Sequence, residues 1–115
     1  MSQARLVLLA SGSGSIAQAI IDAVRSGTLD AKIVGLICDQ SGAQVLERAT
    51  TAKIETFLIP MQQDRGNWDR EIFNKLSSLK PDLVVSAGFM RILAPQFVTN
   101  FKTINSHPSL LPLFP

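Results

Sequence analysis

The chain has a single cysteine and a single histidine, and it has no apolar run long enough to span a membrane. Cys38 alone can form neither an intrachain disulfide nor a cysteine metal cluster, so we expect a small buried side chain and a reducing cytoplasmic location. Met1–Arg5 leads directly into the apolar Leu6–Ala10. This run is too short for a secretory signal, and we interpret it as a first strand.

Charge is also sparse and has no pattern. Lys and Arg together number 11 against nine acidic residues, which gives a net charge of +2, and the cations are scattered along the chain. We therefore expect neither a nucleic acid nor a membrane as partner, and small anions are the candidate ligands. The sequence has no repeat, no low-complexity segment and no linker, so we predict one domain over residues 1–115.

Short apolar runs alternate with amphipathic segments, which is typical of a parallel sheet with crossover helices. Strands are predicted at Leu6–Ala10, Lys32–Cys38, Ile54–Ile59, Leu83–Ala87 and Thr103–Asn105. Helices are predicted from about Ser15 to near Gly27, along the face Val45, Leu46, Ala49 and Ala52, from a cap at Asn67 to Pro81, and briefly near Pro95. The third helix presents Trp68, Ile72, Phe73, Leu76 and Leu79 on its apolar face.

Two glycines lie in the loop Ala10–Ile16, after the first strand. Glycine permits a tight turn, and the unpaired N–H groups at the start of the next helix attract anions such as phosphate. A dinucleotide fingerprint would need a third glycine, although Asp39 after the second strand would suit one. A plain strand-to-helix turn is the alternative.

A second candidate segment, Ala87–Pro95, follows the fourth strand with the sequence AGFMRILAP. Its apolar side chains could form a slot for a flat heterocycle, or they could simply pack against a helix. Arg65 lies in the polar loop of residues 62–66 and could bind a ligand carboxylate through its planar guanidinium, or it could be only solvated.

The histidine itself lies in the sequence NSHPSLLP, residues 105–112. The imidazole of His107 titrates near neutrality, and Asn105 offers an N–H donor to an oxyanion. Pro108 stiffens the loop directly after the histidine. These residues are a candidate catalytic pair, although a lone histidine is often only structural.

In this order, SGSGS, AGFMRILAP and INSHPSLLP resemble the glycinamide ribonucleotide formyltransferases of purine biosynthesis, within the folate-dependent formyltransferase family. The resemblance covers the whole chain. It implies a Rossmann-like α/β fold, with helices on both faces of a mostly parallel sheet. It further implies transfer of a formyl group from 10-formyltetrahydrofolate to glycinamide ribonucleotide, with no metal. Formyltetrahydrofolate deformylase is similar but carries a regulatory domain before its catalytic one.

The resemblance also implies roles for particular residues. Catalysis falls to Asn105 and His107, and the turn at Gly14, Ser15 and Ile16 binds the substrate phosphate. Folate contacts fall to Arg65, Met90, Arg91, Ile92, Leu93 and Asn105. The family often has Asn where Ser13 and Ile16 stand here, which makes backbone donors the expected phosphate contacts.

Members of this family continue well past the last residues of this chain, into a region that supplies an aspartate to the histidine. We therefore expect an amino-terminal part of one formyltransferase domain, cut after about its fifth strand. Such a piece should lack turnover by itself and could self-associate as a homo-oligomer through its exposed apolar faces. A non-catalytic nucleotide- or folate-binding module is the second function that the sequence leaves open.

Overall fold

The computed structural model describes residues 3–87, 89 and 100–106, with only the backbone for residues 105 and 106. The described residues form one sheet in the order β3-β2-β1-β4-β5, and each neighbouring pair is parallel. The strands are β1 (Ala4–Ala10), β2 (Ala31–Cys38), β3 (Thr56–Leu58), β4 (Leu83–Ala87) and β5 (Thr103–Ser106). The predicted parallel α/β sheet is confirmed.

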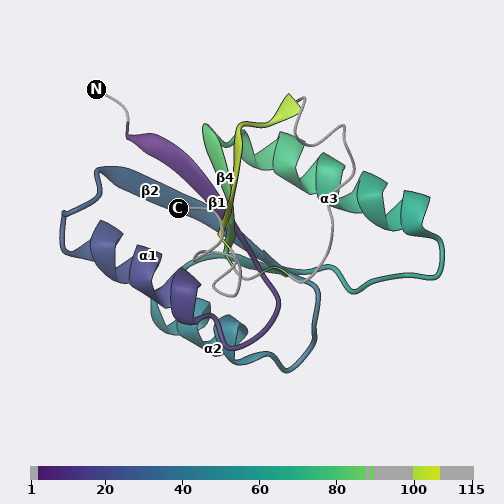
Figure 1. Cartoon of the computed structure of the whole chain (residues 1–115), viewed down its shortest axis with the longest axis horizontal. Helices are drawn as coiled ribbons and strands as arrows, with labels where there is room; N and C mark the ends of the chain where they lie inside the picture. Colours follow the sequence, from purple (N-terminus) through teal and green to yellow (C-terminus); the bar gives the residue numbers. More distant parts are fainter. Residues whose placement is uncertain (1–2, 88, 90–99, 107–115) are drawn as a thin grey trace.

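Within the described residues, the two faces of this sheet are covered by helices α1 (Ser15–Arg25), α2 (Gln44–Thr51) and α3 (Arg65–Leu79). Figure 1 shows α1 and α2 on one face and α3 on the other. Alternate residues of β1 serve the two faces, since Val7 and Leu9 pack in the cluster with α3, and Leu8 and Ala10 in the cluster with α1 and α2. A strand covered on both faces needs apolar side chains at every position, which explains the continuous run. None of the described helices has the length and apolar content that crossing a membrane requires.

The α3 face of the sheet contains the largest buried side chain, Trp68. Trp68, Ile72 and Leu76 are fully buried at helical spacing, and Phe73 and Leu79 pack partly buried against them, as predicted. The indole Nε1 of Trp68 donates a hydrogen bond to the backbone oxygen of Ile59 at 3.0 Å. This bond fixes the polar edge of the ring, which would otherwise be buried without a partner.

The predicted cap of α3 at Asn67 is wrong. Asp64 is the N-cap, with an extended backbone, and its carboxylate accepts a hydrogen bond from the backbone N–H of Asn67 at 3.1 Å. Both residue types cap helices well, but an N-cap oxygen must reach an N–H two or three residues later, which places Asn67 inside the first turn. The helix therefore begins at Arg65.

Strand β3 is shorter than the predicted Ile54–Ile59. The N–H of Ile54 bonds to the oxygen of Ala49, so Ile54 completes the end of α2 before the strand begins. Strands β1 and β2 each begin slightly earlier than predicted, while β4 has its predicted bounds. The short helix predicted near Pro95 lies outside the described residues.

Replacing Trp68 tests the α3 side of the core. We expect Trp68→Ala to lower the free energy of unfolding by about 3–5 kcal/mol, because it removes the largest buried side chain and leaves a cavity. Trp68→Phe should cost about 1–3 kcal/mol, since it leaves the carbonyl of Ile59 without its donor. Urea unfolding followed by circular dichroism measures both.

The matched control is Leu29→Ala, which truncates a side chain that is 42% exposed. It should change the free energy of unfolding by less than about 0.5 kcal/mol. If Trp68→Ala were no more damaging than this control, α3 would not be docked on the sheet through Trp68.

Candidate active site

The carboxyl ends of β1, β4 and β5 lie at one edge of the sheet, because these strands are parallel neighbours. From β1 the chain runs through β2 to β3 on one side, and then places β4 and β5 on the other side. Strand order thus reverses between β1 and β4. Open α/β sheets bind ligands in the crevice outside such a point, which makes this edge the candidate site.

The loop from β1 into α1 turns at Gly14, the N-cap of α1. Gly14 has a φ of 79° in the left-handed region, which glycine adopts without strain. A Cβ at this position would lie 2.6 Å from Cβ and 3.0 Å from Cα of Val45 in α2. Only glycine satisfies both the backbone conformation and this close approach of α2.

The first turn of α1 leaves backbone donors available for an anion. No side chain among the described residues caps this helix, and its first turn contains no acidic residue. Its first helical bond runs from Gln18 N–H to the oxygen of Gly14. The N–H groups of Ser15 and Ile16 precede that bond, at the positive end of the helix dipole. Ile16 packs its side chain partly buried against the core cluster, so only its backbone is placed for an anion.

Helix α2 holds this loop from the side. The N–H of Val45 donates to the oxygen of Gly12 at 3.1 Å, and Nε of Arg48 donates to the oxygen of Ser13 at 2.6 Å. Nothing in the sequence marks Arg48 for this contact, because a charged residue on an amphipathic helix is usually solvated. The contact exists only because α2 packs against the β1–α1 loop.

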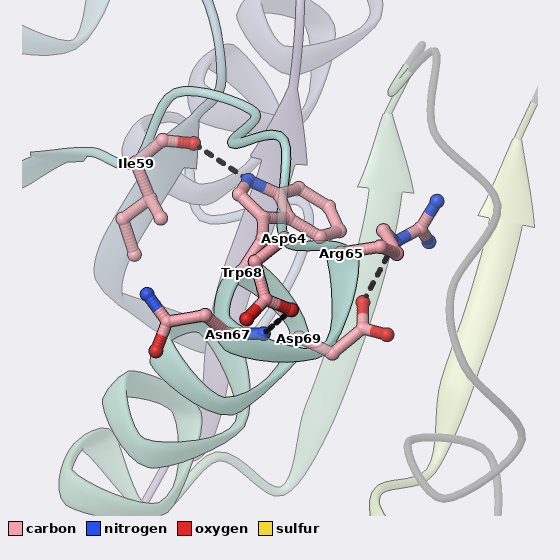
Figure 2. Close-up of polar contacts among 6 residues, drawn as sticks. All are labelled: Ile59, Asp64, Arg65, Asn67, Trp68 and Asp69. Atoms are coloured by element: carbon pink, nitrogen blue, oxygen red, sulfur yellow. Dashed lines mark hydrogen bonds and ion pairs between the residues drawn. The ribbon is translucent and has the colours of Figure 1, made fainter.

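Arg65 is the first residue of α3 rather than a loop residue as predicted, because Asp64 caps the helix. Figure 2 shows its guanidinium beside Trp68 and Asp69. Nε of Arg65 contacts Oδ1 of Asp69 at 2.9 Å, and the guanidinium carbon lies 4.8 Å from the centroid of the Trp68 ring system. Because α3 follows β3, which ends at the carboxyl edge of the sheet, the chain enters α3 from the same edge as the β1–α1 loop, although α3 packs on the other face.

The remaining predicted site residues lie mostly outside the described part of the chain. They are Met90, Arg91, Ile92, Leu93 and His107. Asn105 is the penultimate residue of β5 and pairs with Ser86 of β4, so its backbone reaches the carboxyl edge of the sheet. Phe89 is described, and it stacks on Trp68 with ring centroids 6.1 Å apart, as a core residue does.

Cys38, at the carboxyl end of β2, is fully buried, as predicted. Burial raises the pKa of its thiol, with a smaller opposing effect from the backbone of Gln40. The thiol therefore stays protonated at neutral pH and is a poor nucleophile. Over residues 3–87, 89 and 100–106 no three His, Cys, Asp or Glu side chains gather as metal ligands.

Comparison with known proteins defines the class. Residues 4–115 match the formyl transferase family, and the chain belongs to that family. It is 43% identical over 97% of its length to phosphoribosylglycinamide formyltransferase of Mycobacterium tuberculosis, and 40% identical over 96% to that of Escherichia coli. It covers 53% and 54% of those two proteins, so it spans about half the length of the curated relatives it matches.

Solved structures agree with the fold. Glycinamide ribonucleotide transformylase 1 from Symbiobacterium toebii superimposes with a TM-score of 0.88 at 35% identity, over 98% of this chain and 55% of that one. A formyltetrahydrofolate deformylase from Pseudomonas putida gives a TM-score of 0.82 over 90% of this chain and 38% of that one, but its identity is only 18%, which shows a shared fold alone. The resemblance predicted from the three motifs is confirmed.

Gly14→Ala tests the loop geometry. We expect it to lower the free energy of unfolding by about 2 kcal/mol or more, because alanine is strained in the left-handed backbone conformation and its Cβ would clash with Val45. Binding of inorganic phosphate, followed by amide chemical shifts, should weaken in parallel.

Gly12→Ala is the control, because a Cβ there meets no atom within 4 Å and the backbone of Gly12 is not left-handed. It should leave both stability and phosphate binding nearly unchanged. If Gly14→Ala changed the free energy of unfolding and phosphate binding as little as Gly12→Ala does, the turn would not depend on a glycine at position 14.

Proposed function

We propose that this chain takes part in the transfer of the formyl group of 10-formyltetrahydrofolate to the amine of 5'-phosphoribosylglycinamide, a step of purine biosynthesis. The observation that carries the proposal is the left-handed, uncapped turn at Gly14, which lies at the edge of the sheet where strand order reverses. The named activity of the relatives supports it. In this proposal residues 1–115 form the amino-terminal part of a single formyltransferase domain.

The substrate phosphate binds the β1–α1 turn. Gly14, Ser15 and Ile16 supply backbone N–H groups, and the positive end of the α1 dipole favours the anion. Backbone donors are independent of side-chain identity, so the isoleucine at position 16 does not remove them. Its side chain is partly buried and packs against the core cluster between the sheet and helices α1 and α2.

The folate co-substrate binds along the same edge. We assign contacts with its heterocycle to Met90, Arg91, Ile92 and Leu93, which follow β4 in the sequence. Arg65 meets the carboxylate of the glutamate tail. Support for this role is its place at the start of α3, its half-exposed side chain and its contact with Asp69, which restricts the guanidinium before a ligand arrives.

The chemistry follows from Asn105 and His107. The substrate amine attacks the formyl carbon, and a carbon–nitrogen bond forms while the carbonyl oxygen takes the negative charge of a tetrahedral intermediate. Asn105 and protonated His107 donate hydrogen bonds to this oxyanion. The bond to the folate nitrogen then breaks, and His107 helps move the proton lost by the amine to that departing nitrogen.

The proposed partners are two small molecules, and the proposed location is the cytoplasm, where a lone buried thiol stays reduced. Association with a second copy of the chain belongs to the same proposal, and neither nucleic acid nor a membrane does. The alternative reaction is hydrolysis of 10-formyltetrahydrofolate, which shares the folate site and needs no ribonucleotide.

Turnover distinguishes the two reactions. A suitable enzyme is residues 1–115 joined to the half of the Escherichia coli relative that this chain does not match. We expect absorbance to report loss of 10-formyltetrahydrofolate only when glycinamide ribonucleotide is present. Formate release at the same rate without the ribonucleotide would assign the deformylase reaction instead.

In that fusion, His107→Ala and Asn105→Ala should each lower turnover by about two to four orders of magnitude, because each donor acts on charge that develops in the transition state. Circular dichroism should show the fold intact, and Leu29→Ala serves as a surface control. Near-normal turnover in either variant would remove that residue from the mechanism.

A further inference from the structure

Two contacts from α2 fix the direction of peptide groups in the β1–α1 loop. The oxygens of Gly12 and Ser13 accept hydrogen bonds from Val45 N–H and from Nε of Arg48. In a trans peptide the C=O and the following N–H point in opposite directions, and the described chain has no cis peptide. The N–H groups of Ser13 and Gly14 therefore point away from α2.

Arg48 is itself held in place from a second side. Its Nη1 donates to Oε1 of Gln18 in α1 at 3.3 Å, and Nε2 of Gln18 donates to Oδ1 of Asp22 at 2.9 Å. The guanidinium is planar, so its Nε and Nη1 donors reach Ser13 and Gln18 in one fixed orientation. An arginine bound at two points in this way has already lost the rotamer freedom that a solvated one keeps.

Without the hydrogen bond from Arg48 to the Ser13 oxygen, the loop could present different groups to an anion bound in the turn. A peptide group free to rotate could present the oxygen of Ser13, which carries partial negative charge, to the phosphate. With that oxygen bound to Arg48, the neighbouring N–H of Gly14 keeps its direction and adds to the donors at the start of α1. Successive N–H groups arranged in this way form the concave anion sites known as nests.

We propose that Arg48 is a positioning residue for the substrate phosphate: it holds the Ser13 carbonyl away from the anion and keeps the Gly14 N–H directed toward it. The proposal rests on the function proposed above, which assigns this loop to a phosphate. It assigns Arg48 no contact with the phosphate itself.

The test uses the 115-residue chain labelled with ¹⁵N, titrated with inorganic phosphate and then with glycinamide ribonucleotide. Arg48→Met removes both donors, and Arg48→Lys restores a donor and the charge. Arg25→Met removes an exposed arginine at the end of α1. We expect phosphate affinity to fall about tenfold in Arg48→Met, as for loss of one charge-assisted hydrogen bond, with partial recovery in Arg48→Lys. Arg25→Met should bind like the unmodified chain.

Amide shifts of the free protein separate positioning from direct binding and from stability. In Arg48→Met the Ser13 and Gly14 amide signals should move before any phosphate is added, while the melting temperature changes by only a few degrees. Weaker binding with both signals unmoved would mean that Arg48 pairs directly with phosphate and would overturn the proposal, as would unchanged affinity. If the unmodified chain bound neither phosphate nor the ribonucleotide in this loop, the proposed function would fail together with this inference.

Discussion

The absence of a side chain at Gly14 determines how closely α2 can approach the start of α1. Val45 packs where a Cβ of residue 14 would stand, and this approach brings its N–H to the oxygen of Gly12 and brings Arg48 to the oxygen of Ser13. The packing of α2 on one face of the sheet and the arrangement of donors at the carboxyl edge therefore both depend on the missing Cβ at residue 14. A larger residue at position 14 would disturb both together.

Most of the fold could be predicted because each local pattern agrees with the tertiary structure. Buried parallel strands require apolar residues at successive positions, and the run from Leu6 to Ala10 has them. The start of α3 could not be predicted in the same way. Asp64 and Asn67 are equally good caps, and the choice between them follows from where the chain leaves β3 and where Trp68 enters the core.

A residue of the candidate site could be predicted from the sequence only where its residue type has few other structural roles. Gly14 stands out because a left-handed turn before a helix favours glycine. Arg48 does not, since its contact with a backbone oxygen 35 positions away arises only when α2 docks on the loop. Arg65 is an intermediate case. A helix brings residues at i, i+4 spacing together, so its pairing with Asp69 could be predicted, but only once the helix is known to begin at Arg65.

Trp68 is the only tryptophan, and the chain contains no tyrosine. Nearly all of its near-ultraviolet absorbance and emission thus comes from one indole, whose N–H is bound to Ile59 and whose ring stacks on Phe89. Phe89 directly precedes the residues assigned to the folate heterocycle, and the cation of Arg65 lies over the same indole. The protein therefore has a single optical probe that contacts Phe89, the residue that comes just before those the proposal assigns to the folate heterocycle.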